Sequence, residues 1–300
     1  MIDASLGASR LEDEPARGLD PAPAHVAVVD GLRGAAALLV LLYHCWVFTD
    51  PPLDGGPLRA LAACGALGVD FFFVISGFVL FLPVARRGGA FGSVRGYLLR
   101  RVARIVPAYY ASLLLQALAV PLLTPFATPF ASAGGWLVLA AHLLFVQHEL
   151  PASLAHAAGF RGDVLGFGVN GVLWSLSIEA LFYVTLPLVA GAFFRRPLSG
   201  LLGALLATLC WRAAVPALGP GASAALIDQY PAFLLHFAFG MCGALLYVRL
   251  WPERGSRAAA IVVVQLASLV ALLLAMTSYG RVVAATPPGA AVELLPGLLP

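Results

Sequence analysis

The chain has 300 residues, of which 61% are hydrophobic and only 11% are charged, and its mean hydropathy is +0.91. Soluble domains carry about 25% charged residues, so this composition excludes a water-soluble globule. The long apolar runs also lack the alternation of apolar and polar residues that a membrane β-barrel requires. The sequence therefore predicts an all-α, polytopic transmembrane helical bundle, in which the positions of the charges matter more than the small net charge of +3.

The predicted elements begin after a polar, proline-rich segment at the start of the chain. Residues 1–24 lack the basic start and apolar core of a signal peptide, so we predict a short disordered cytoplasmic tail there. Residues 25–300 are predicted to form one transmembrane domain. Its apolar runs are close to the ~20 residues that cross a membrane, and they predict spans at 26–48, 67–85, 104–123, 172–194, 198–217, 231–250 and 258–280.

Two further stretches shape the expected number of spans. The apolar run at 136–147 is short, which predicts a re-entrant, interfacial or buried helix, and residues 148–170 are predicted to be a loop. The last eleven residues resemble the start of another span. We therefore expect about 8–10 spans in the whole bundle and a C-terminus that is truncated within it.

Arginines orient the predicted bundle, because cytoplasmic loops of membrane proteins are enriched in basic residues. They gather in three segments between spans: Arg86, Arg87, Arg95, Arg100, Arg101 and Arg104; Arg195 and Arg196; and Arg249, Arg254 and Arg257. These segments are predicted to be cytoplasmic, and residues 49–66 and 218–230 to lie outside. In this orientation His44, Asp70 and Glu179 are expected at a similar depth in the outer half of the membrane.

His44 is the candidate general base. Histidine titrates near neutrality and can take a proton from a hydroxyl and return it. A carboxylate that is hydrogen-bonded to the other ring nitrogen would fix the tautomer of the histidine, and we expect Glu179 or Asp70 to serve as this carboxylate. The alternatives are an interfacial histidine at position 44 and a helix-start carboxylate at Asp70 that interacts with the helix dipole. The cost of placing ionisable groups in a membrane favours functional roles.

The arginines near the predicted cytoplasmic face are candidates for anion binding. Arg33 follows Asp30 by three residues, which fits either an ion pair at the start of the helix or an anion-binding group that faces an inner cavity. Arg100 and Arg104 share a helix face, with Arg101 between them. This cluster is either an ordinary anchor to anionic lipid or a phosphate-binding group for a donor such as coenzyme A.

The remaining polar residues of the spans are given structural interpretations. Ser76 is expected to pack between helices and to bond to its own backbone rather than to act as a nucleophile. Four further histidines have no metal-ligand spacing and are interpreted as loop or core residues: His142, His148, His156 and His236. We therefore predict no metal site.

Four segments in chain order resemble the membrane acyltransferase 3 family, which includes O-antigen and nodulation-factor acetylases. The first segment has a basic residue, ten intervening residues and a histidine; the second is rich in phenylalanine; the third is rich in arginine and ends in proline; the fourth joins Trp-Ser-Leu to a glutamate. In this chain they are LRGAAALLVLLYH (32–44), GVDFFFVISGF (68–78), RRVARIVP (100–107) and WSLSIEALFYVTLP (174–187).

The resemblance implies an enzyme of the bacterial inner membrane that transfers an acyl group, usually acetyl from acetyl-CoA. The implied acceptor is a hydroxyl of a carbohydrate, glycolipid or small molecule, and no nucleic acid is expected. By resemblance, His44 is the catalytic histidine, and Glu179 and Asp70 support it. The residues implied in binding the acyl-CoA donor are Arg33, Arg100, Arg101 and Arg104. Members usually have a late Ser-Tyr…Tyr-Leu-x-His segment, which these 300 residues lack.

A membrane transporter is the rival hypothesis from the residues alone. Its intramembrane relay would consist of Arg33, His44, Asp70 and Glu179. Transporters often show internal repeats, and this sequence has no convincing repeat. An assembly protein without activity is the third hypothesis.

Overall fold

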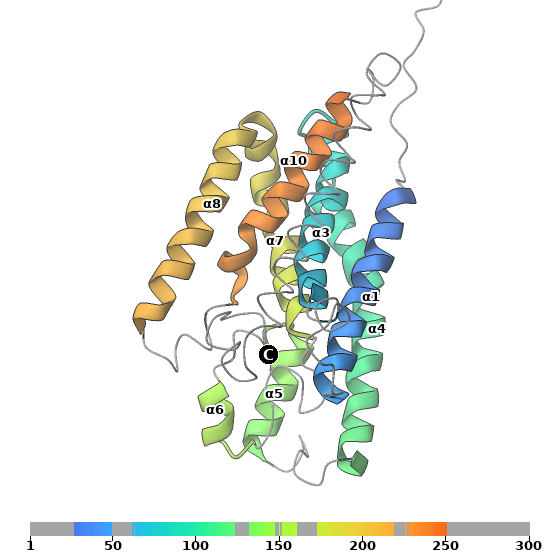
Figure 1. Cartoon of the computed structure of the whole chain (residues 1–300), viewed down its shortest axis with the longest axis vertical. Coiled ribbons are helices and arrows are strands. Elements are labelled where there is room, and N and C mark those ends of the chain that lie inside the picture. The colour runs from blue at the N-terminus through green and yellow to red at the C-terminus, as the bar shows by residue number, and fades with distance from the viewer. Residues whose placement is uncertain are drawn as a thin grey trace, which may run out of the picture.

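The computed structural model of the chain describes residues 27–49, 62, 64–123, 132–147, 150, 152–160, 173–218, 226 and 228–250. Within these ranges the backbone is helical and contains no strand, so the predicted fold class is confirmed. The elements are α1 (Ala27–Thr49), η1 (Gly65–Leu67), α3 (Gly68–Arg86), α4 (Val94–Leu123), α5 (Ala133–Leu143), α6 (Ala152–Ala157), α7 (Trp174–Arg195), α8 (Pro197–Ala214), η3 (Val215–Leu218), η4 (Tyr230–Phe233) and α10 (Leu234–Leu250) (Figure 1).

Six helices form at the predicted apolar spans, because each run is long enough to satisfy its own backbone hydrogen bonds in lipid. Among the described residues, four helical segments are long and apolar enough to cross a membrane: Gly65–Arg86, Trp174–Arg195, Pro197–Ala214 and Tyr230–Leu250. Helices α1 and α4 also match predicted spans, and α4 begins ten residues before its apolar run. The predicted tail at 1–24 and span at 258–280 lie outside the described residues.

The start of α4 shows why that helix is longer than its apolar run. Ser93 precedes the helix, and its Oγ accepts a hydrogen bond of 3.1 Å from the backbone N–H of Gly96. This satisfies one of the amide donors that a helix start leaves unpaired. Arginine and leucine then continue the helix, because both have high helix propensity.

The arginine-rich turns lie at one end of the bundle. The turn from α3 to α4, the turn from α7 to α8 and the C-terminal end of α10 are all at the upper end in Figure 1, and α1 begins below them in the upper half of the view. The described arginines of the three predicted cytoplasmic segments therefore belong to one side, as the topology from the sequence requires.

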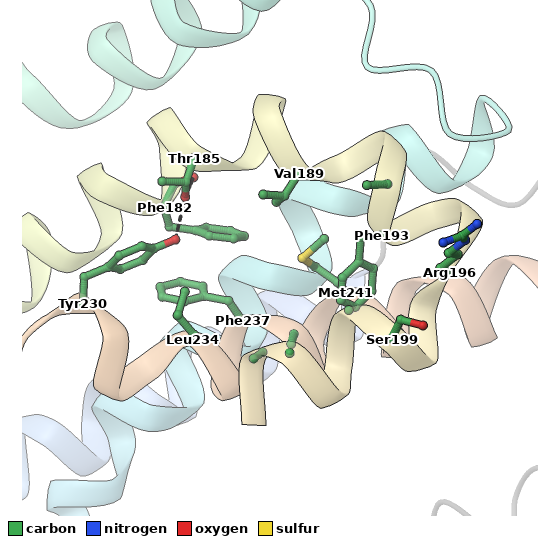
Figure 2. A pocket seen from close by; sticks show the side chains of 15 residues that line it. Phe182, Thr185, Val189, Phe193, Arg196, Ser199, Tyr230, Leu234, Phe237 and Met241 are labelled. Atoms are coloured by element: carbon green, nitrogen blue, oxygen red, sulfur yellow. Dashed lines mark hydrogen bonds between the residues drawn. The ribbon is translucent and has the colours of Figure 1, made fainter. Parts of the chain in front are cut away.

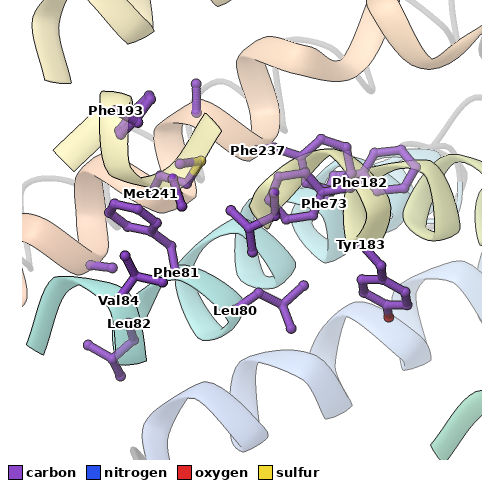
Figure 3. Close-up of a cluster of buried hydrophobic side chains, with 14 of the residues drawn as sticks. Phe73, Leu80, Phe81, Leu82, Val84, Phe182, Tyr183, Phe193, Phe237 and Met241 are labelled. Atoms are coloured by element: carbon purple, nitrogen blue, oxygen red, sulfur yellow. The ribbon is translucent and has the colours of Figure 1, made fainter. Parts of the chain in front are cut away.

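Helix α3 is the centre of the core. Its phenylalanines pack with those of α7 and α10, as Figure 3 shows for Phe73, Phe182 and Phe237. The rings of Phe182 and Phe237 are stacked with centroids 4.0 Å apart. Helices α3 and α10 approach so closely that a Cβ on Gly77 would overlap the backbone of Phe237, and one on Gly240 would overlap the backbone of Val74. Small residues permit this close packing of membrane helices.

The short apolar run after position 130 forms α5, which has 11 residues. At ~1.5 Å per residue it covers about 16 Å, too little to cross ~30 Å of hydrocarbon, as its length predicted. Ser132 caps it by accepting a 3.1 Å hydrogen bond from the N–H of Gly135. The expectation of a loop throughout 148–170 is wrong, because residues 152–157 form α6, which packs on α5 through Ala155 and Val138.

Candidate active site

His44 lies on α1, five residues before the helix ends, and its side chain is half-buried. Its Nδ1 is 2.7 Å from the carbonyl oxygen of Val40, one turn earlier in the same helix. A carbonyl oxygen only accepts hydrogen bonds, so Nδ1 carries the proton in this contact and Nε2 holds the lone pair of the neutral ring. The helix backbone therefore fixes the tautomer, a role that the sequence assigned to a carboxylate.

Glu179 belongs to a different group of side chains, which we call the Glu179 cluster: Ser76, Glu179, Tyr183 and Arg101. Ser76 Oγ donates a 2.7 Å hydrogen bond from α3 to Glu179 Oε1 on α7. The hydroxyl of Tyr183, one turn further along α7, also hydrogen-bonds the carboxylate. The expectation that Ser76 bonds to its own backbone is wrong, because the buried Ser76 hydroxyl finds its acceptor in the carboxylate that α7 presents to it.

His44 and Glu179 also lie at different depths. Tyr43, the neighbour of His44, packs against Gly65, where an added Cβ would be 2.7 Å from the Cβ of Tyr43. Ser76 follows Gly65 by eleven residues, which is about 16 Å along the helix. The predicted shared depth of His44 and Glu179 is therefore wrong. The positions where apolar runs begin and end do not determine how far one helix is shifted along its axis relative to its neighbour. Close packing at small residues determines that shift.

Asp70 anchors a second group, which we call the Asp70 cluster: Asp70, His236, Arg212 and Asp228. Asp70 Oδ1 on α3 is 3.2 Å from His236 Nε2 on α10, and both side chains are about one quarter exposed, at 26% and 27%. Arg212 of α8 and Asp228, which precedes η4, are close enough to act on Asp70 electrostatically.

In the structure the partner of Asp70 is thus His236, whereas the sequence analysis proposed Asp70 as a partner of His44. The interpretation of His236 as an ordinary loop or core residue missed this pair. A signal was present, because Asp70 and His236 each lie within five residues of the predicted outer end of their own span, at 67 and 231.

The arginines of α4 divide between two faces of the helix. Arg100 and Arg104 are exposed, whereas Arg101 is half-buried and its guanidinium carbon lies 5.9 Å from the centroid of the Tyr97 ring, within cation–π range. Arg101 also acts electrostatically on Tyr183. Its Nε is buried and has no hydrogen-bond partner among the described residues. Of the three, Arg101 is the one that faces the Glu179 cluster.

Arg33 lies on α1, eleven residues before His44, and its side chain is half-buried. This spacing corresponds to about 16 Å along the helix. In Figure 1, α1 begins in the upper half of the bundle, on the side of the arginine-rich turns, and runs downwards. Arg33 is therefore on the side of Arg101, and His44 is near the opposite end of α1.

Comparison with known proteins identifies the family of the chain. Residues 26–296 match the family described as "Acyltransferase domain". The match covers most of the chain, so the chain belongs to this acyltransferase family, and the resemblance drawn from its four motifs is confirmed. Membership also disfavours the transporter hypothesis. No solved structure matches the chain.

Three curated relatives each match part of the chain. It is 31% identical over 173 residues to "Acyltransferase MdmB" of Streptomyces mycarofaciens, covering 57% of this chain and 40% of that one. It is 30% identical to "Nodulation protein 10" of Rhizobium leguminosarum bv. viciae, covering 60% and 48%. It is 26% identical to "Putative O-acetyltransferase SACOL0978" of Staphylococcus aureus (strain COL), covering 55% and 24%. The matched region is thus less than half the length of each relative.

Proposed function

We propose that this protein is an integral O-acyltransferase of the bacterial inner membrane. It moves an acyl group, acetyl first of all, from acyl-CoA to a hydroxyl of a carbohydrate or similar cell-surface or secreted acceptor. The observation that carries this proposal is His44, held in one tautomer on an apolar helix of a chain that belongs to an acyltransferase family. The names of the relatives, an acyltransferase and an O-acetyltransferase among them, support it.

The chemistry assigned to His44 is general base catalysis. Nε2 takes the proton of the acceptor hydroxyl while that oxygen attacks the thioester carbonyl carbon. The carbon–sulfur bond then breaks, and the imidazolium returns its proton to the departing thiolate of coenzyme A. Because the carbonyl of Val40 accepts from Nδ1–H, the charge that develops on the ring is stabilised by the helix backbone.

The donor is assigned to the arginine-rich end of the bundle. Arg100 and Arg104 are exposed there and suit the phosphates of coenzyme A, because guanidinium groups bind phosphate through paired hydrogen bonds. Arg101 has a buried Nε that offers a further donor to a group entering between α4 and α7. The thioester then has to extend about 16 Å along α1, from the level of Arg33 to that of His44.

The two carboxylates receive separate roles under this proposal. Glu179 holds Ser76 and Tyr183 on the donor side, and Arg101 lies beside them. Glu179 is therefore assigned to the path of the donor and not to the orientation of His44. Asp70 and His236 are partly exposed at the start of α3 and the start of α10, on the side predicted to face outwards. There they suit hydrogen bonding to an acceptor that carries hydroxyl groups.

The test is incubation of membranes that contain the full-length protein with acetyl-CoA labelled in its acetyl group. The expected result is label on a carbohydrate, lipid or secreted product that is absent from membranes of a deletion strain. Movement of a solute across the membrane without transfer of label would contradict the proposal and favour a transporter. Equal labelling in the deletion strain would also contradict it.

A further inference from the structure

A pocket of about 510 Å³ lies between α7, α8 and α10 (Figure 2). Its lining contains neither Glu179, Asp70 nor His44, so it is separate from both polar clusters. Most of its wall is apolar and comes from residues such as Phe182, Val189, Phe193, Leu234, Phe237 and Met241. The pocket therefore suits a hydrocarbon chain.

The polar groups of the pocket lie at its two ends. Figure 2 shows Thr185 and Tyr230 at one end and Arg196 and Ser199 at the other. The Thr185 and Tyr230 hydroxyl oxygens are 2.5 Å apart, and Thr185 also donates a 3.3 Å hydrogen bond to the carbonyl of Phe182. These two hydroxyls satisfy each other, so that end offers little to a ligand. Arg196 and Ser199 offer a positive charge and a hydroxyl to an anion.

The length of the pocket matches one leaflet of a bilayer. Thr185 and Arg196 are eleven residues apart, which is about 16 Å along a helix and roughly half of the ~30 Å hydrocarbon core. Arg196 lies at the turn from α7 to α8, at the end of the bundle that holds the arginine-rich turns. The charged mouth of the pocket is therefore at an interface, and its closed end is near mid-membrane.

Helix α8 leaves this pocket accessible from the side. Only 6% of its span is buried within the protein, compared with 50% for the span Gly65–Arg86. One side of α8 packs on the core through Leu201, Ala204 and Trp211, and Thr208 Oγ1 donates a 3.1 Å hydrogen bond to the carbonyl of Pro231. A hydrocarbon chain could enter from the surrounding lipid and fill the space between α8 and the core.

We propose that this pocket binds one anionic phospholipid of the cytoplasmic leaflet. One acyl chain occupies the apolar slot, and the headgroup phosphate contacts Arg196 and Ser199. The bound lipid fills the gap behind α8 and holds that helix against α7 and α10. This inference concerns a site that the proposed acyl transfer does not use, so each can fail without the other.

The test uses the full-length protein purified in mild detergent and examined by native mass spectrometry with added phosphatidylglycerol or phosphatidylcholine. The wild type is expected to retain one phosphatidylglycerol in preference to phosphatidylcholine. Arg196→Ala is expected to weaken that retention about tenfold, the loss of one charge-assisted hydrogen bond. Arg195→Ala is the matched control, because Arg195 is adjacent and exposed but does not line the pocket, and it should leave retention unchanged.

A second pair of variants tests the apolar slot without disturbing the fold. A Cβ added at Gly203, which lines the pocket, meets no atom within 4 Å, and the same is true at Gly34 on the exposed side of α1. Gly203→Leu should abolish retention, whereas Gly34→Leu should not. Undiminished retention by Gly203→Leu, equal retention of the two lipids, or displacement of phosphatidylglycerol by equimolar palmitoyl-CoA would overturn the proposal.

Discussion

Asp70 and Ser76 lie six residues apart on α3, yet they belong to two different polar clusters. Six residues are about one and two-thirds helical turns, so the two side chains leave α3 on different faces. Ser76 is 4% exposed and joins α3 to Glu179 on α7, whereas Asp70 is 26% exposed and joins α3 to His236 on α10. One phenylalanine-rich segment thus supplies a buried serine hydroxyl to one cluster and a partly exposed carboxylate to the other.

The two clusters differ in the exposure of their side chains, and this difference determines how costly the loss of a hydrogen-bond partner is. In the Glu179 cluster, the hydroxyls of Ser76 and Tyr183 are buried, so each depends on its protein partner and loss of that partner is costly. In the Asp70 cluster, Asp70 and His236 are each about one quarter exposed, so solvent can partly replace a lost partner. Variants at matched positions of the two clusters should therefore give effects of different size.

The largest expected effect on stability is that of Glu179→Ala. It leaves the hydroxyls of Ser76 and Tyr183 without their acceptor, at about 1–3 kcal/mol for each buried group. Asp70→Ala should cost less, because His236 remains partly hydrated. The free energy of unfolding, or the thermal midpoint in detergent, measures both. Equal losses for the two variants would contradict the distinction between the buried hydroxyls beside Glu179 and the partly exposed partner of Asp70.

The next effect concerns the donor. Arg101→Gln removes the inward-facing guanidinium and should raise KM for acyl-CoA about tenfold, as expected for one charge-assisted hydrogen bond. Arg100→Gln is the control of the same chemistry on the exposed face of α4, where salt and solvent screen the charge, so its effect should be smaller. Steady-state kinetics of both variants provide the comparison. A larger effect of Arg100→Gln would contradict the inward role of Arg101.

A pH dependence should come from Asp228 of the Asp70 cluster. Burial raises the pKa of its carboxyl to about 6, partly offset by Arg212. The unfolded chain has a pKa near ~3.9, so between about pH 4 and pH 6 the folded state binds more protons and stability falls as pH rises. The Asp228→Asn variant has no carboxyl at this position, so it does not undergo this loss of stability as pH rises. It should be more stable than the wild type by about 1 kcal/mol at pH 7, after discounting for partial exposure, and by nothing at pH 4.

Thermal unfolding at the two pH values measures this effect. A stability difference between Asp228→Asn and wild type that is the same at pH 4 and pH 7 would show that the carboxyl of Asp228 titrates as it does in the unfolded chain.

The smallest expected effect is the coupling between Asp70 and His236. Their side chains are 26% and 27% exposed, and ion pairs with access to solvent contribute about 0.2–1 kcal/mol. A double-mutant cycle with Asp70→Asn and His236→Gln measures the coupling directly. A coupling above about 2 kcal/mol would contradict the expectation that solvent weakens this pair.

The sequence predicted the helices well because hydropathy and length determine which segments can satisfy their backbone in lipid. It also identified the family through four motifs, and the family match over residues 26–296 confirms that membership. Its failures concern contacts between helices. The pairing of Glu179 with Ser76 depends on axial offsets, and those offsets follow from close contacts at Gly65, Gly68, Gly77 and Gly240 that no single helix reveals.

The tautomer of His44 was missed for a related reason. The sequence argument looked for a carboxylate from another span, whereas the acceptor is the carbonyl of Val40 in the same helix. His142 makes the same contact, with Nδ1 2.8 Å from the carbonyl of Val138, so a histidine within an apolar helix can satisfy one nitrogen locally. A search for backbone carbonyls four residues earlier would have found both.

Transfer of labelled acetyl by a His44→Ala variant tests the central claim most directly. His156→Ala, a change of the same chemistry on α6, is the control, and elution as a folded monodisperse species is required of both. If His44 is the general base, His44→Ala should lose about 10²–10⁴-fold in transfer rate while His156→Ala keeps the wild-type rate. A folded His44→Ala variant that transfers acetyl at the wild-type rate would contradict the claim.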